Sequence, residues 1–379
     1  MPRPYLFYGL PTSMFSASTR SYLRFKKIPY VEKVPSMFTY LVTIKKHCGS
    51  AQAPVLVDPD GVWLSDSSDI IDILEQRFPQ VPVVPGTPLQ KFAAYLFELW
   101  GNEFWYSTAL HTRWSHPENY PIWEADMCRM LPGLPQWLRG LILRKSAQPM
   151  LNAHHKPMGV VPENFATIDG WTEQQLDLLE AHFAEHLYLF GSRPSLADMG
   201  VEITLYGHLY LDPWSRHNLI DPRPNVKAWL ERMQEQPKPL QGEFLPADQI
   251  PATLLPLLRG MCHDMLPALQ AMLQETLAIL PQTDGSKHLP RTLGMIEQPM
   301  GERSIRRVAM PYTLWMTQRM LDVYHGMSAA DQQSVREWLA TLGGEGLLSL
   351  EIPRLRRVGL FAAIDSASHP QAGVSRTVE

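Results

Sequence analysis

One stretch, residues 52–78, constrains the fold more than any other part of the sequence. Residues 53–57 (APVLV) are apolar and rich in β-branched side chains, which favours a buried strand. The tetrapeptide DPDG at 58–61 predicts a tight turn, because its proline presets φ and its glycine accepts a positive φ. We expect a return strand at 62–64, and then a helix with one apolar face. That face would carry Ile70, Ile71, Leu74 and Phe78.

The same stretch has two features that suit ligand binding. The nitrogen of Pro54 cannot donate a hydrogen bond, so the neighbouring backbone of Ala53 is free to pair with another partner. The predicted helix begins after Ser65-Asp66-Ser67, where unpaired N–H groups can bind an anion and the side chains can cap the helix. The alternative is an ordinary β-hairpin packed on a helix.

Length and composition set the broad class of protein. The chain has 379 residues, so we expect two or three domains. Its hydrophobic share of 45% and charged share of 19% are typical of globular proteins. The formal net charge of −4 argues against nucleic-acid binding. No apolar run is long enough to cross a membrane, and the first residues become polar too quickly for a secretory signal, so we expect neither feature.

The three cysteines, Cys48, Cys128 and Cys262, are far apart and have no C-x-x-C spacing. This pattern argues against a disulfide framework and against a zinc site, so we expect no bound metal and a cytoplasmic location.

Three regions follow from the order of the predicted elements. Residues 1–80 predict the order β-α-β-α-β-β-α, and a proline-rich linker follows at 78–88. Residues 89–237 predict helices only, including one that begins with the capping spacing of Ser195 and Asp198. Residues 254–365 predict a further, mainly helical extension. Its expected elements are a helix at 257–280, with a break at Pro267 as an alternative, a hairpin around 299–301, and helices at 311–324 and 328–342.

Four motifs in this order resemble the glutathione S-transferase family. They are FYGLPTSMFSASTR at 7–20, APVL at 53–56, LSDSSDIIDILE at 64–75 and LFGSRPSLADMGVEITLY at 189–206. The resemblance covers residues 4–237. It implies an α/β thioredoxin-like domain for glutathione binding, followed by an all-α helical domain for the second substrate. The extension after residue 237 departs from the family pattern.

The resemblance implies a catalytic role for Ser13. Glutathione reacts as its thiolate, and a hydroxyl at a helix N-terminus can donate a hydrogen bond to that sulfur. Ser13 stands where the family places its catalytic Ser or Cys, and Ser16 is a second hydroxyl three residues later. The alternative is that Ser13 only caps the helix.

The resemblance also implies the residues that bind glutathione, the co-substrate. Ala53, before a cis Pro54, would pair with the cysteinyl backbone, and Asp66 and Ser67 would bind the γ-glutamyl end. Gln52, Lys45 or Lys46 would meet the glycyl carboxylate, unless these side chains are simply solvated.

The second substrate, an apolar electrophile, would bind between the two domains. The candidate residues are Phe15, Phe104, His111, Arg113 and Trp114, although most aromatic residues at helical spacing belong to a core.

We therefore expect a glutathione transferase of the serine type, which the family resemblance suggests is a homodimer. Two other functions stay open. A non-catalytic binding or scaffold protein could keep this fold. A glutathione-dependent reductase is the other, although neither position 13 nor position 16 is a cysteine. The extension could cover the site, form a dimer contact or be a separate module. Its arginine clusters, 303–307 and 354–357, suit a solvated or salt-bridged surface better than an anion site.

Overall fold

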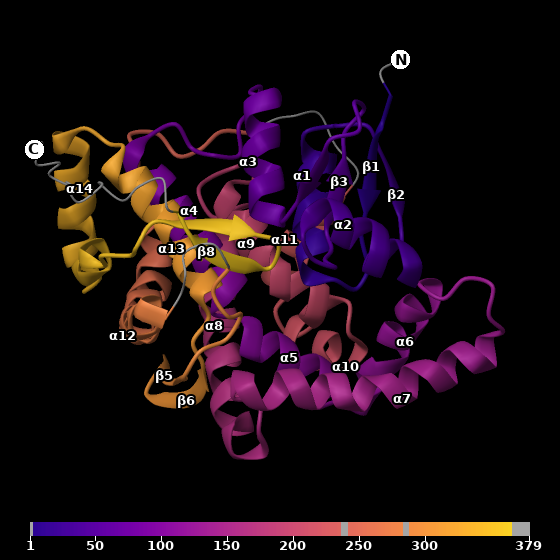
Figure 1. Ribbon diagram of the computed structural model, residues 1–379. Helices are drawn as coiled ribbons and strands as arrows, with labels where there is room; N and C mark the ends of the chain where they lie inside the picture. The colour runs from indigo at the N-terminus through magenta and orange to yellow at the C-terminus, as the bar shows by residue number, and fades with distance from the viewer. Residues whose placement is uncertain (1–2, 236–241, 283–287, 366–379) are drawn as a thin grey trace, which may run out of the picture.

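A four-stranded mixed sheet forms the first part of the chain (Figure 1). The computed structural model describes residues 3–235, 242–282 and 288–365. The strands are β1 (Tyr5–Tyr8), β2 (Tyr30–Lys33), β3 (Val55–Val57) and β4 (Trp63–Ser65), in the order β2-β1-β3-β4. Strand β1 pairs parallel with β2 and antiparallel with β3, which pairs antiparallel with β4. With α1 (Met14–Phe25), α2 (Lys45–Cys48) and α3 (Ser67–Arg77), this sheet is the expected thioredoxin-like domain.

The predicted turn between β3 and β4 is held by its first residue. The carboxylate of Asp58 accepts hydrogen bonds from the backbone N–H groups of Asp60, at 3.0 Å, and Val62, at 2.8 Å. The same side chain forms an ion pair with Arg77 at the end of α3, at 2.9 Å. The turn therefore fixes α3 against the strands that precede it.

Helices make up the second part of the chain. They are α4 (Pro88–Glu103), α5 (Tyr106–Trp114), α6 (Tyr120–Arg129), α7 (Gln136–His155), α8 (Phe165–Glu185), α9 (Leu196–Thr204), α10 (Pro213–Ser215) and α11 (Pro224–Gln234). The predicted capping box is confirmed, since Ser195 and Asp198 cap α9 reciprocally. Helices α4 and α9 cross at Gly101 and Gly200, so closely that a Cβ atom on Gly101 would lie 2.2 Å from the carbonyl oxygen of Gly200.

The extension combines helices with two β-hairpins. Its elements are α12 (Leu255–Ile279), β5 (Met295–Met300), β6 (Arg303–Val308), α13 (Pro311–His325), α14 (Ala329–Ala340), β7 (Leu355–Val358) and β8 (Phe361–Ile364). The predicted hairpin around 299–301 is confirmed, whereas the β7–β8 hairpin was not predicted. Helix α12 continues through Pro267, so the alternative of a break is wrong. Buried Ala268 and Leu269 follow the proline, and their packing outweighs the lost hydrogen bond.

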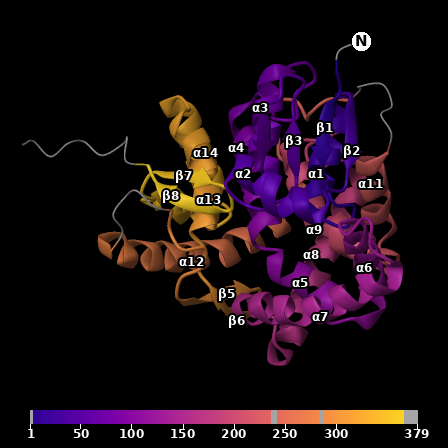
Figure 2. The same cartoon turned by 45° about the vertical axis from the view of Figure 1, so that its right-hand side comes forward.

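The extension packs against the first two parts of the chain, beside α3 and α4 (Figure 2). On α4, the ring of Phe92 makes edge contacts with Tyr324 of α13 and Trp338 of α14. Buried apolar side chains from all three parts form one continuous core. Within the described ranges, no helix has the length and apolar character that a membrane span requires.

Candidate functional site

A cavity lies where the three parts of the chain meet. Its volume is about 100 Å³, which is below the roughly 300 to 1,000 Å³ of typical small-molecule sites. The first part contributes Phe15, Gln52, Ala53, Pro54, Asp66 and Ser67. The helical part contributes Asn102, Glu103 and Tyr106, and the extension contributes Arg291, Met310, Tyr312 and Leu360. The cavity is small because the extension closes the side that the thioredoxin-like domain and α4 leave open.

The structure brings the five predicted glutathione-binding residues together along this cavity: Gln52, Ala53, Pro54, Asp66 and Ser67. The peptide bond between Ala53 and Pro54 is cis, as expected. The side chain of Gln52 is buried, and its amide donates to the carbonyl of Cys48 at 3.4 Å. Lys45 and Lys46 are exposed and do not border the cavity.

Asp66 lies at the junction of β4 and α3 in an unusual backbone conformation. Its φ is +78°, a region that residues with side chains rarely adopt and that is enriched at functional sites. One carboxylate oxygen accepts hydrogen bonds from the backbone N–H groups of Ser68, at 3.0 Å, and Asp69, at 3.4 Å. The other oxygen accepts a hydrogen bond from the hydroxyl of Tyr312 in the extension. The extension thus contacts the residue expected to bind the ammonium group of glutathione.

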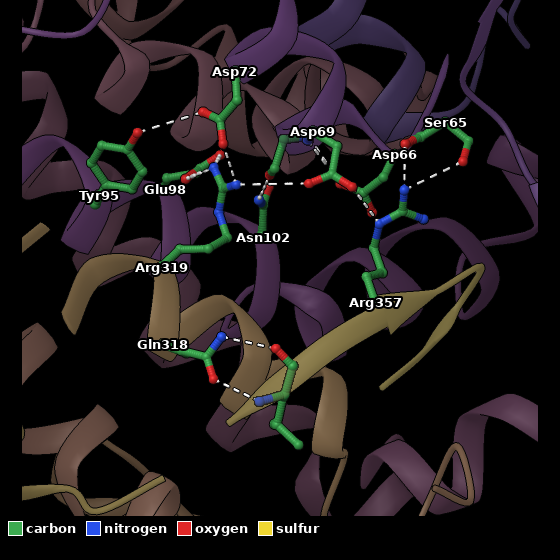
Figure 3. Close-up of polar contacts among 12 residues, drawn as sticks. Ser65, Asp66, Asp69, Asp72, Tyr95, Glu98, Asn102, Gln318, Arg319 and Arg357 are labelled. Atoms are coloured by element: carbon green, nitrogen blue, oxygen red, sulfur yellow. Dashed lines mark hydrogen bonds and ion pairs between the residues drawn. The ribbon is translucent and has the colours of Figure 1, made fainter. Parts of the chain in front are cut away.

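Two arginines of the extension hold α3 from the same side (Figure 3). Arg357 forms an ion pair with Asp69 at 2.7 Å and donates to the carbonyl of Ser65 at 2.8 Å. Arg319 forms ion pairs with Asp72 at 2.5 Å and with Glu98 of α4 at 3.0 Å.

These contacts decide only part of the expectation for the arginine clusters. Arg303, Arg306, Arg354 and Arg356 are exposed, whereas Arg307 is fully buried and Arg357 is mostly covered. The expected solvated or salt-bridged role therefore holds for the four exposed arginines and for the ion-paired Arg357, and it does not hold for the buried Arg307.

The cavity wall contains a carboxyl group that titrates near neutral pH. Burial raises the pKa of Glu103 to about 7, and this effect outweighs the hydrogen bond that the Thr313 hydroxyl donates to its Oε2 at 2.5 Å. Arg307 lies behind Glu103 and donates to its backbone carbonyl at 3.1 Å. Burial lowers the pKa of Arg307 to about 10. Near pH 7 the site therefore exists in two charge states, which differ by the proton on Glu103.

The predicted catalytic hydroxyl lies next to this cavity along the chain. Ser13 is half-buried and precedes α1, and its Oγ accepts a hydrogen bond from the backbone N–H of Ser16 at 3.4 Å. Within the described ranges, no interaction is found in which the Ser13 hydroxyl is the donor. Ser16 is fully buried and its Oγ accepts from the N–H of Leu10 at 3.2 Å. Ser13 itself does not border the cavity, whereas Phe15, two residues later, does.

Four of the five candidate residues for the second substrate lie outside the cavity. Phe104 is buried in the core. His111 pairs with Asp169 at 3.0 Å. Arg113 pairs with Asp212 at 2.8 Å. Trp114 packs on Trp123 with ring centroids 4.8 Å apart. These side chains have structural partners inside the helical part, and only Phe15 among the candidates borders the cavity.

The sequence reasoning missed seven cavity residues: Asn102, Glu103, Tyr106, Arg291, Met310, Tyr312 and Leu360. Nothing local marks them, because the fold brings them to the cavity from distant positions in the chain. The described residues contain no group of His, Cys, Asp or Glu side chains that could hold a metal ion.

Comparison with known proteins gives matches over two parts of the chain. Residues 7–82 match the family model of the glutathione S-transferase N-terminal domain, and residues 172–232 match that of the glutathione S-transferase C-terminal domain. A search of curated proteins gives no match.

Solved structures to which the chain is similar include three from bacteria. A glutathione S-transferase from Rhodospirillum rubrum F11 is 17% identical, with a TM-score of 0.39 over 65% of this chain and 96% of that chain. A glutathione S-transferase from Methylobacillus flagellatus, solved with glutathione bound, is 17% identical, with a TM-score of 0.40 over 61% and 95%. FzlA from C. crescentus is 16% identical, with a TM-score of 0.42 over 66% and 97%.

The two family models match the first sheet and the later helices in the order in which the structure has them. Residues 7–82 and 172–232 are therefore similar to the two domains of the glutathione S-transferase family.

Proposed function

We propose that the cavity binds glutathione and that the protein transfers the glutathionyl group, through its sulfur, to an electrophilic, apolar substrate. The observation that supports this function is the shared position of Gln52, Ala53, Pro54, Asp66 and Ser67 along one cavity. The cis Ala53–Pro54 peptide would pair with the cysteinyl backbone. The carboxylate of Asp66 and the first turn of α3 would bind the two ends of the γ-glutamyl zwitterion.

Ser13 would stabilise the thiolate. Its Oγ already accepts one hydrogen bond, from Ser16, and its proton remains available to donate to a sulfur. The thiolate then attacks an electrophilic carbon: the carbon–sulfur bond forms as the bond to the leaving group breaks, and the leaving group departs with that electron pair. Because the closed cavity is smaller than a typical ligand site, glutathione entry requires roof side chains such as Tyr312 and Met310 to move.

The test is the variant Ser13→Ala in a conjugation assay with glutathione and a chloronitrobenzene. We expect turnover to fall by roughly 10- to 1,000-fold, the scale of losing one hydrogen-bond donor to a developing charge. Ser328→Ala is the matched control, because Ser328 caps α14 in the same way and does not border the cavity. Full activity of Ser13→Ala with wild-type glutathione affinity would contradict the role of Ser13.

One observation favours a second function, a non-catalytic protein that keeps this fold. The extension covers one side of the cavity, and the hydroxyl of its Tyr312 donates a hydrogen bond to an oxygen of Asp66. Isothermal titration with millimolar glutathione separates the two functions, since an absence of binding heat favours the non-catalytic protein. The proposed homodimer in the cytoplasm is tested separately, by sedimentation and by localisation of the tagged chain.

A further inference from the structure

Arg291 differs from the other residues that line the cavity, because it is the sole cation among those the structure describes. The two lysines expected at the glycyl end of glutathione, Lys45 and Lys46, do not border the cavity. Arg291 precedes β5 in the extension and is exposed, so it lies where the cavity opens to solvent.

The guanidinium of Arg291 has no partner of its own in the described parts of the chain, where neither an ion pair nor a hydrogen bond is found for it. The extension's buried or half-buried arginines behave differently: Arg319 and Arg357 form ion pairs, and Arg307 donates to a backbone carbonyl. Arg291 is therefore a charged group at a ligand cavity that no protein group neutralises through direct contact.

The positive charge of Arg291 affects ionisable groups that line the cavity. It is close enough to oppose the rise in the pKa of Glu103 and of Tyr106, which both line the cavity, and of Tyr40. It also lowers the pKa of His154. The cavity carboxylates already have donors, since Tyr312 donates to Asp66 and Thr313 donates to Glu103. The positive charge is thus left for a ligand.

We propose that Arg291 binds a carboxylate of the ligand at the mouth of the cavity. A guanidinium binds a carboxylate through two parallel hydrogen bonds, and the apolar side chains of Phe15, Met310 and Leu360 lower the local polarity. This inference rests on the proposed glutathione-dependent function. The carboxylate can come from the glycyl end of glutathione or from the second substrate.

The test compares Arg291→Gln with Arg303→Gln, a control that removes an exposed arginine of β6 outside the cavity. Isothermal titration measures binding of glutathione and of γ-glutamylcysteine, which lacks the glycyl carboxylate. A conjugation assay compares benzyl chloride with 4-(chloromethyl)benzoate. In both reactions the thiolate attacks the benzylic carbon and chloride leaves, so the pair differs only in the carboxylate.

If the glycyl carboxylate binds Arg291, Arg291→Gln weakens the binding of glutathione by roughly 10- to 100-fold and leaves the binding of γ-glutamylcysteine unchanged. If the second substrate supplies the carboxylate, the variant raises KM for 4-(chloromethyl)benzoate by the same factor and leaves benzyl chloride unchanged. Either result supports the proposal, provided that Arg303→Gln behaves as the wild type.

Equal binding and kinetics for Arg291→Gln and the wild type overturn the role of Arg291 and leave the proposed function intact. If the wild type binds neither glutathione nor γ-glutamylcysteine, the role of Arg291 and the proposed function are both overturned.

Discussion

Glu103 makes the stability of this protein depend on pH in a way that one substitution should remove. Its carboxyl is fully buried, and the folded chain raises its pKa from 4.5 to about 7. A group whose pKa is raised by folding binds its proton more tightly in the folded state, so the stability that it contributes is full below pH 4.5 and is lost as pH rises through 7. At pH 8 the charged carboxylate costs the folded state roughly 3 kcal/mol.

Glu103→Gln keeps an oxygen for the hydrogen bond from Thr313 and cannot ionise. We therefore expect the variant to gain stability relative to the wild type as pH rises from 5 to 8, by up to about 3 kcal/mol. The measurement is the urea midpoint of both proteins at pH 5, 6, 7 and 8. Glu302→Gln is the control, because Glu302 is exposed on the β5–β6 turn.

A difference in midpoint between Glu103→Gln and the wild type that is the same at pH 5 and at pH 8 would refute this reasoning. The same result in Glu302→Gln as in Glu103→Gln would also refute it, since the effect would then not depend on burial.

Two further substitutions test contacts that stabilise the fold, one between the extension and the rest of the chain and one inside the helical part. Arg319→Met should lower the free energy of unfolding in urea by about 3 to 5 kcal/mol, because it leaves Glu98 buried without its counter-ion. The control Arg354→Met removes a surface ion pair and should lower it by less than about 1 kcal/mol. Equal losses would show that the ion pairs of Arg319 do not stabilise the docked extension. Gly101→Ala should lower the melting temperature, since the added methyl group meets the backbone of α9, and the cost is about 1 to 3 kcal/mol or more. Gly260→Ala is the control, because Gly260 lies inside α12 with open space around it, and this change should raise stability by about 0.5 to 1 kcal/mol. If Gly260→Ala were also destabilising, the loss of stability in Gly101→Ala could not be assigned to the contact between α4 and α9.

The sequence predicted the parts of the fold that depend on local chemistry. The hairpin and helix at residues 53–77 follow from a short apolar run rich in β-branched residues, a Pro-Asp-Gly turn and capping side chains, all within one short segment. The capping box of Ser195 and Asp198 is local in the same sense. The β7–β8 hairpin was missed because its strands are short and Arg356 and Arg357 interrupt their apolar pattern.

The candidate site was predictable only where it follows family motifs. Pro54 and Asp66 have such motifs, so their place along the cavity could be expected. The cavity residues that the extension contributes could not be predicted. Arg291 and Tyr312 reach the cavity through contacts between distant segments, and no local pattern records such contacts. The expectation of a second-substrate site at His111 and Arg113 is wrong, because these polar side chains have partners inside the helical core that the sequence does not reveal.

The docking of the extension on α3 has a consequence for how the chain folds during its synthesis. Domains of a chain generally fold as units, with the N-terminal one first during synthesis. The thioredoxin-like domain and the helices after it leave the ribosome while Asp69, Asp72 and Glu98 still lack Arg319 and Arg357. The newborn chain therefore carries these carboxylates without their arginine partners, and the last of the ion pairs can form only when Arg357 has been translated.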